Sequence, residues 1–199
     1  PAVMAAAARA AKLAGGRKDN VIAAAKGVVR VLGIPPEEGA ADLAGLGFDP
    51  AFTNADTDLV QLADRVLATK TLSVSFCLYG APGTGKSAFA RWLAGRMGLE
   101  VIQKRGSDIQ SMYVGETEKN IARAFEEAAD TRSFLIFDEA DSFLDDRAHA
   151  TKSWEVSQVN EMLTWMERHP FPFAATTNLM ARLDPASLRR FLFKVRFSA

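Results

Sequence analysis

A glycine-rich segment at residues 80–87 has the residue types and spacing that bind phosphate. Its sequence is GAPGTGKS, which fits the pattern G-x-x-x-x-G-K-[ST] at every fixed position. An apolar run at 74–79 precedes it, and a helix-competent run at 87–97 follows it. In such a loop, successive backbone N–H groups point at phosphate oxygens, and the N-terminus of the following helix favours negative charge. The segment therefore predicts a nucleotide-binding site.

The side chains of this loop have distinct expected tasks. The Lys86 ammonium would reach the β- and γ-phosphates, and the Ser87 hydroxyl would ligand Mg²⁺. The alternative is a glycine-rich turn without a ligand, and the strand and helix on either side argue against it. The residues expected to contact the nucleotide are Gly80, Pro82, Gly83, Thr84, Gly85, Lys86, Ser87 and Ala88.

Two carboxylates further along the chain supply what nucleotide hydrolysis needs in addition. Four apolar residues at 134–137 predict a buried parallel strand, and Asp138 and Glu139 follow at its C-terminal end. Ligands bind at that end of the strands in open α/β sheets. Asp138 is expected to bind the Mg²⁺ of the nucleotide, and Glu139 to orient the attacking water. An apolar strand that runs into an acidic loop is common, so the pair gains its meaning from the phosphate loop upstream.

The chain from residue 72 onward alternates strand and helix patterns. This alternation predicts an α/β fold of the P-loop NTPase kind, with a five-stranded parallel sheet sandwiched by helices. Gly98 is expected to cap the first helix after the phosphate loop. The predicted strands are 72–79, 100–103, 134–137, 171–176 and 193–197, and the predicted helices are 58–68, 86–97, 117–129 and 154–167.

Composition sets broader limits. Residues 1–47 are rich in Ala and Gly, so we expect a small helical N-terminal segment apart from the domain at 48–199. The formal net charge is zero, which argues against nucleic-acid binding driven by overall charge. The single cysteine, Cys77, cannot form an internal disulfide and fits a reducing, cytoplasmic location. No apolar run approaches membrane-spanning length, so no membrane partner is expected. A chain that starts with Pro1 is expected to be processed or a fragment.

Together with the phosphate loop and the acidic strand, three more segments occur in a known order along the chain. They are GSDIQSMYVGETEKNI at 106–121, AATTN at 174–178 and LDPASLRRF at 183–191. With these five motifs, residues 55–197 resemble AAA ATPases, and within them the group that remodels or unfolds proteins. The resemblance implies ATP and ADP as ligands, Mg²⁺ as cofactor, a hexameric homo-oligomer for the full-length protein, and a protein substrate. The helical lid that follows the fifth strand in this family has no counterpart in this sequence, so weaker nucleotide binding is expected.

The same resemblance implies roles for polar residues near the end of the chain. Asn178 would lie beside the γ-phosphate and the attacking water as sensor 1. Arg189 and Arg190 would enter the nucleotide site of the neighbouring subunit, where an arginine offsets charge in the transition state. Family members often have a Gly and a spaced second arginine here, whereas this chain has an adjacent pair. Arg190 is the preferred candidate for the finger; the alternative for both is a solvated pair at a helix end.

The resemblance also implies a pore loop, formed by Tyr113, Val114 and Gly115. In a ring of subunits this loop would line the channel and grip an extended polypeptide. The alternative is that Tyr113 is a core residue. The apolar face of the following helix should pack on the sheet, so the pore-loop interpretation predicts an exposed Tyr113. The residues of that face are Ile121, Ala124, Phe125 and Ala128.

Two other functions stay open at this stage. A DNA-handling relative, such as an initiator or loader, would need basic or wedge elements that face nucleic acid, and none is visible in the sequence. Tyr113 also favours a polypeptide. The presence of both Asp138 and Glu139 argues against a nucleotide-dependent scaffold that does not hydrolyse ATP. ATP hydrolysis coupled to protein remodelling is therefore the leading hypothesis.

Overall fold

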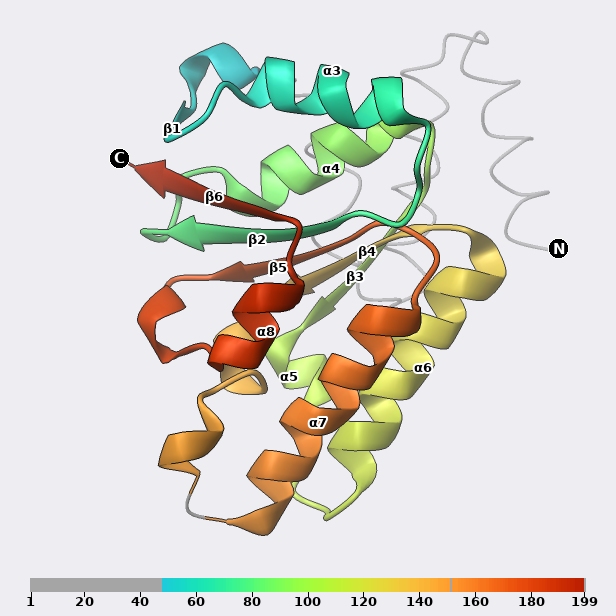
Figure 1. The fold of residues 1–199 in the computed structure, drawn as a ribbon, viewed down its shortest axis with the longest axis vertical. Coiled ribbons are helices and arrows are strands. Elements are labelled where there is room, and N and C mark those ends of the chain that lie inside the picture. Colours follow the sequence, from blue (N-terminus) through green and yellow to red (C-terminus); the bar gives the residue numbers. More distant parts are fainter. Residues whose placement is uncertain (1–47, 151, 199) are drawn as a thin grey trace, which may run out of the picture. The chain divides into compact units, whose positions relative to one another are not determined.

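The computed structural model describes residues 48–150 and 152–198. The helical segment predicted at 1–47 lies outside the described residues. The architecture is α/β, as predicted, with a mostly parallel sheet between two layers of helices (Figure 1). Within the described part of the chain, no helix is long and apolar enough to span a membrane.

The sheet has six strands in the order β1-β6-β2-β5-β4-β3. Their bounds are β1 (Asn54–Ala55), β2 (Ser75–Gly80), β3 (Val101–Arg105), β4 (Phe134–Asp138), β5 (Phe173–Thr177) and β6 (Phe193–Ser198). The five predicted strands all form, and their pairings with one another are all parallel. The sixth strand, β1, adds an antiparallel edge against β6 and was missed. Two residues are too few to show the alternation by which a strand is predicted.

Helices cover both faces of this sheet. Figure 1 shows α3 and α4 on one side, and α6, α7 and α8 on the other. The helices are α3 (Leu59–Thr69), α4 (Lys86–Met97), α5 (Gly106–Ile109), α6 (Glu116–Thr131), α7 (Ser153–Arg168) and α8 (Pro185–Arg190). Short 3₁₀ turns are η1 (Pro50–Phe52), η2 (Ala140–Ser142), η3 (Arg147–His149) and η4 (Met180–Arg182). Gly98 caps α4 in the left-handed conformation, as predicted.

The strand residues divide between two hydrophobic cores because successive side chains point to opposite faces. In β2, Phe76 and Leu78 join the core under α3 and α4, whereas Cys77 joins the core under α6 and α7. In β4, Phe134 and Phe137 divide in the same way. Cys77 is fully buried, and burial raises the pKa of its thiol to about 12, so it packs as a small apolar residue.

His169, at the end of α7, is buried in an aromatic cluster. Its ring contacts those of Phe125, Phe171 and Phe173. Neither ring nitrogen has a hydrogen-bond partner among the described residues. Burial lowers the pKa of His169 from 6.5 to about 4, because a charged imidazolium is poorly solvated there. The native state therefore holds this ring in its neutral form near pH 6.

We predict that His169 makes the fold acid-sensitive. Between pH 6.5 and 4, this histidine binds a proton in the unfolded chain but not in the native state. The free energy of unfolding therefore falls as the pH falls through this window. At 1.36 kcal/mol per pH unit the loss is at most about 3 kcal/mol. When unfolding by denaturant is measured at several pH values, the free energy of unfolding should decline less for His169→Phe than for the parent protein. Parallel curves for the two proteins would show that His169 is protonated freely in the native state.

Candidate nucleotide site

The C-terminal ends of neighbouring strands bring the predicted nucleotide-binding residues to one edge of the sheet. The phosphate loop follows β2, the acidic pair follows the apolar part of β4, and Asn178 follows β5. These segments enclose a cavity of about 240 Å³. Its lining consists of Pro82, Gly83, Lys86, Ser87, Arg105, Asp138, Glu139, Thr176, Thr177 and Asn178. Residues that lie far apart in sequence thus converge as the motif order predicts.

The phosphate loop begins at a glycine that no other residue could replace without strain. Gly80 has φ 142°, and a Cβ there would lie 2.0 Å from the carbonyl oxygen of Phe197 on β6. Such a separation is a clash with backbone, which cannot move aside easily. The close approach of the two strands therefore requires a glycine at the point where the chain leaves β2 for the loop.

Lys86, the first residue of α4, holds the loop and the end of β5 together. Its Nζ donates hydrogen bonds of 2.8 Å to the carbonyl oxygens of Gly80 and Ala81 and to Oδ1 of Asn178. The side chain is buried, and burial lowers its pKa, while Asp138 and Asp141 act in the opposite direction. The ammonium group is thus placed inside the loop, where it can meet anionic oxygens.

Asp138 is the centre of a second polar cluster. Its Oδ1 accepts hydrogen bonds from Ser87 Oγ at 2.6 Å and from Thr176 Oγ1 at 2.9 Å, and its Oδ2 accepts from Gln103 Nε2. A hydroxyl and a carboxylate are the oxygen ligands that suit Mg²⁺. In the described ranges there is no cluster of three or more His, Cys, Asp and Glu side chains that could hold a metal. Ser87 and Asp138 together suit a Mg²⁺ ion that is also bound by phosphate oxygens, which is the usual arrangement for this ion.

Glu139 occupies a strained backbone position. It has φ 59° and ψ 45°, in the left-handed region that residues with a Cβ seldom adopt. The residue is exposed, and no group in the described part of the chain donates a hydrogen bond to its carboxylate. The carboxylate therefore borders the cavity without being tied to a structural partner. Strain of this kind is often kept where a side chain must be presented to a ligand.

Sequence reasoning missed four residues of this site. Gln103 and Arg105 come from β3, and Thr176 and Thr177 come from β5. Gln103 also accepts a hydrogen bond from Arg91 Nη1 at 2.9 Å, which orients its amide toward Asp138. Arg105 is the register partner of Asp138 across β3 and β4. A signal was available, since polar residues two apart at the end of a strand share one face.

The two candidate finger residues do not line this cavity; they lie on α8. Arg190 is engaged by its own chain: Nε donates to Glu167 Oε1 at 2.8 Å and Nη1 to the carbonyl oxygen of Ala186 at 3.0 Å. Arg189 is exposed, and its guanidinium makes no hydrogen bond or ion pair within the ranges that the structure describes. The two neighbours therefore differ in how freely they could reach another molecule.

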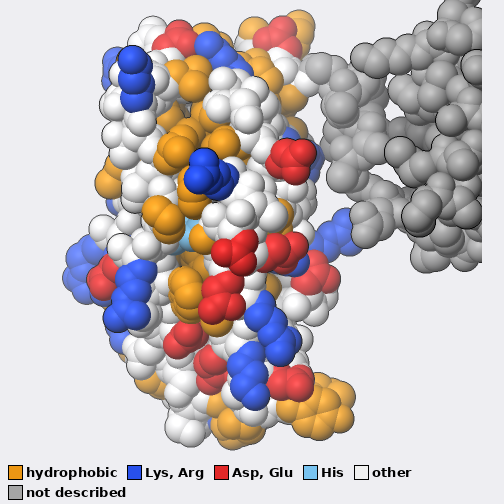
Figure 2. Space-filling model, turned by 90° about the vertical axis from the view of Figure 1, so that its right-hand side faces the viewer, with side chains coloured by type: hydrophobic (Ala, Val, Ile, Leu, Met, Phe, Trp, Pro, Cys, Tyr) orange, Lys and Arg blue, Asp and Glu red, His pale blue; other side chains and the backbone are white. Residues whose placement is uncertain are grey.

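The segment that contains the predicted pore loop lies away from the core, before α6. Met112, Tyr113 and Val114 are 95%, 70% and 76% exposed, so the prediction that Tyr113 is exposed is confirmed. The expected apolar face of α6 is buried, as predicted. Apolar side chains also project at the lower end of the space-filling view (Figure 2). Met112 borders a second cavity, of about 530 Å³, whose wall includes Trp154 at the start of α7.

Comparison with known proteins agrees with this geometry. The family model described as "ATPase family associated with various cellular activities (AAA)" matches residues 76–199. The chain therefore belongs to the AAA family, whose members bind ATP, typically with Mg²⁺, and often form oligomers.

Curated relatives resemble the chain over this same domain. An uncharacterized protein, ORF529, of Acidianus two-tailed virus is 37% identical over 136 residues, which are 61% of this chain and 26% of that protein. The peroxisomal ATPase pex6 of Schizosaccharomyces pombe is 35% identical over 56% of this chain and 13% of its own length. The nuclear valosin-containing protein-like of Mus musculus is 35% identical over 56% of this chain and 14% of its own length. The matched part is thus a small share of each relative.

The strain at Glu139 can be measured. Glu139→Gly should be more stable than Glu139→Ala by about 0.5–1 kcal/mol, because only glycine adopts the left-handed conformation freely. At Glu126, an exposed position within α6, the Ala variant should instead be more stable than the Gly variant by about 1 kcal/mol. Unfolding the four variants with denaturant measures both differences in stability. If Ala is the more stable replacement at both sites, the backbone at Glu139 is not strained.

Proposed function

We propose that this chain is the ATP-hydrolysing core of a ring-forming AAA machine that remodels or unfolds proteins. The observation that carries the proposal is the convergence of Lys86, Asp138 and Asn178 on one cavity at the ends of parallel strands. An anion in this cavity would meet the Lys86 ammonium and the N-terminal end of α4. The geometry supports a triphosphate whose terminal phosphates lie beside these groups.

Each residue of the cavity has a role in this proposal. Lys86 exchanges its hydrogen bonds to carbonyl oxygens for bonds to the β- and γ-phosphates. Ser87 and Asp138 hold Mg²⁺, which neutralises charge on the phosphate oxygens when bound. Glu139, with its untied carboxylate, orients the attacking water. Asn178, which accepts a hydrogen bond from Lys86, contacts the γ-phosphate from the end of β5. The phosphates are enclosed by the backbone of Gly80, Pro82, Gly83, Thr84, Gly85 and Ala88.

An arginine from a neighbouring subunit would complete this site. Both candidates lie on α8, outside the cavity, which fits action on another subunit better than on their own. Arg190 remains our preferred finger from the motif order, although it must first release Glu167. Arg189 has no hydrogen bond or ion pair of its guanidinium to break within the described residues. Separate Arg189→Ala and Arg190→Ala variants of the full-length protein decide between them.

Protein rather than nucleic acid is the proposed substrate. The exposed Met112, Tyr113 and Val114 offer apolar and aromatic surface, with Gly115 at φ 83° as the turn into α6. Such surface grips an extended polypeptide of varied sequence. Acidic and basic side chains are interspersed on the face drawn in Figure 2, and the net charge is zero. This distribution gives no support to a phosphate-backbone interface.

Two substitutions separate nucleotide binding from hydrolysis. Lys86→Ala should weaken ATP binding at least about tenfold, because charge-assisted hydrogen bonds to phosphate are lost. Glu139→Gln should bind Mg·ATP within about twofold of the parent protein and lose nearly all turnover, since the amide keeps the shape without the charge. Calorimetry measures the first effect and phosphate release by the full-length protein the second.

An exposed lysine serves as the matched control for this experiment. Lys119→Ala, on the surface of α6, should leave the affinity for ATP within about twofold of the parent value. Unchanged ATP affinity in Lys86→Ala would remove the phosphate-loop assignment. Normal turnover in Glu139→Gln would remove Glu139 from the reaction and leave ATP binding in place.

The remodelling proposal is tested at Tyr113. Tyr113→Ala should cost less than about 1 kcal/mol of stability, because the side chain is 70% exposed, whereas Phe125→Ala, in the core, should cost about 3–5 kcal/mol. In the full-length protein, Tyr113→Ala should keep basal ATPase activity and lose unfolding of a protein substrate, and Tyr113→Phe should retain both. Retained unfolding by Tyr113→Ala would exclude the pore-loop role.

A further inference from the structure

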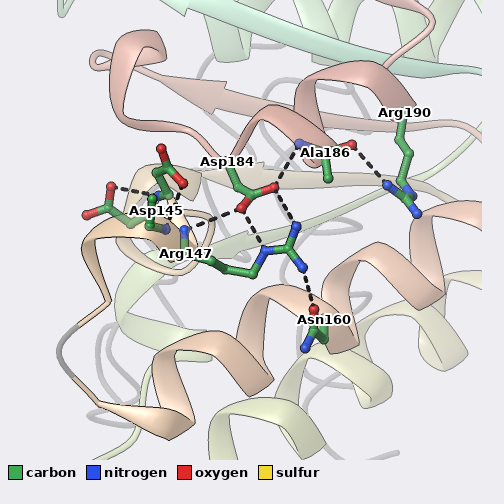
Figure 3. A network of polar contacts seen from close by, with 8 residues as sticks. Asp145, Arg147, Asn160, Asp184, Ala186 and Arg190 are labelled. Atoms are coloured by element: carbon green, nitrogen blue, oxygen red, sulfur yellow. Dashed lines mark hydrogen bonds and ion pairs between the residues drawn. The ribbon is translucent and has the colours of Figure 1, made fainter.

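A buried carboxylate fixes the start of α8, the helix that bears the two arginines. Asp184 is 2% exposed, and its Oδ1 accepts a hydrogen bond from the backbone N–H of Ala186 at 2.8 Å. Arg147 closes over the same carboxylate (Figure 3): Nε donates to Oδ2 at 2.7 Å and Nη2 to Oδ1 at 3.3 Å. The backbone N–H of Arg147 also donates to Oδ2, at 3.3 Å. One carboxylate thus joins the helix cap to an arginine from another segment.

Arg147 belongs to the segment that leaves the nucleotide site. It lies in η3, which follows β4 and Glu139 along the chain. Its remaining Nη1 donates to Asn160 Oδ1 on α7 at 2.8 Å. Backbone hydrogen bonds from Asp184 N to Leu144 O and from Asp146 N to Arg182 O run beside this contact. A single side chain therefore ties η3, α7 and α8 together (Figure 3).

The helix itself is too short to hold its own direction. It spans Pro185–Arg190, and Ser187 is its one buried member. A helix of this length is unstable alone, so its orientation depends on its anchors. Hydrogen bonds from Arg147 and the Ala186 N–H outweigh the effect of burial and hold the pKa of Asp184 below its usual range. The anchor thus stays ionised at neutral pH.

We propose that Arg147 is a positioning residue for hydrolysis: through Asp184 it fixes α8 and so directs the arginine of that helix at the neighbouring subunit's nucleotide. This inference rests on the proposed function, in which Arg189 or Arg190 acts in trans. It predicts that loss of Arg147 slows hydrolysis in the nucleotide site of the next subunit and not in the site of its own subunit. That distinction can be measured in mixed assemblies.

The test uses the full-length protein. Arg147→Ala should bind ATP within about twofold of the parent protein and lose at least tenfold in turnover. Mixing it with Glu139→Gln subunits should restore turnover, because one interface then combines an intact carboxylate with a well-placed arginine. Mixing it with subunits that carry both Arg189→Ala and Arg190→Ala should restore nothing. The reverse pattern would mean that Arg147 serves its own site and would overturn the inference.

Two controls separate positioning from folding. Arg147→Ala leaves Asp184 buried without its partner, so a double variant, Arg147→Ala with Asp184→Ser, removes that charge and keeps a capping oxygen. It should regain thermal stability while turnover stays low; recovery of turnover with stability would show a purely structural role. Arg182→Ala, which breaks an exposed ion pair with Asp145 nearby, should keep turnover within about twofold of the parent.

The shared assumption has its own control. Subunits with both α8 arginines replaced, mixed with Glu139→Gln subunits, should regain turnover if an arginine acts in trans. If this mixture stays inactive, the proposed function fails and the inference about Arg147 fails with it. If it regains turnover and the Arg147→Ala mixture does not, only the inference about Arg147 is overturned.

Discussion

The hydrogen bonds of the Lys86 ammonium are the interaction on which the nucleotide site depends. One positive group satisfies two carbonyl oxygens of the phosphate loop and the amide oxygen of Asn178. It thereby connects the ends of β2 and β5, which are neighbours in the sheet. Burial of this charge is tolerable because each of its three donors has a partner. The two donors that meet carbonyl oxygens are those that terminal phosphates would engage.

The sheet makes this arrangement possible by confining polar groups to its ends. Between α3 and α4 on one face and α6 and α7 on the other, the strands are lined by apolar residues such as Phe76, Leu135 and Ala175. Polar side chains appear where the strands emerge from these cores. Asp138 and Thr176 therefore meet Ser87 at one edge, and their hydrogen bonds are made at the border of a cavity.

The residues to which we assign roles in binding, hydrolysis and remodelling differ in how firmly they are held. Asp138 is surrounded by three donors, and Arg147 and Asp184 anchor α8 from a buried position. Glu139 has an exposed and untied carboxylate on a strained backbone. Tyr113 projects from the surface before α6. The groups proposed to contact reacting water and moving substrate are thus the least restrained, whereas those proposed to hold the nucleotide are the most restrained.

The amino-acid sequence by itself determined the phosphate loop, the acidic strand end and the alternation of strands with helices. These features are local: GAPGTGKS and the apolar run before Asp138 carry their meaning within a few residues. The bounds of α4 were predicted to the residue, and in the structure Gly85 and Gly98 flank it. Strand β1, with two residues, had no local pattern and formed only because β6 offered an edge.

Only the tertiary structure decided which distant side chains meet. Gln103 reaches Asp138 because β3 pairs with β4 in a particular register. Arg190 contacts Glu167, and Arg147 contacts Asp184, because α7 and the segment after β4 pack beside α8. Such contacts depend on strand order and helix packing. These are properties of the whole buried core, and no short stretch of sequence encodes them.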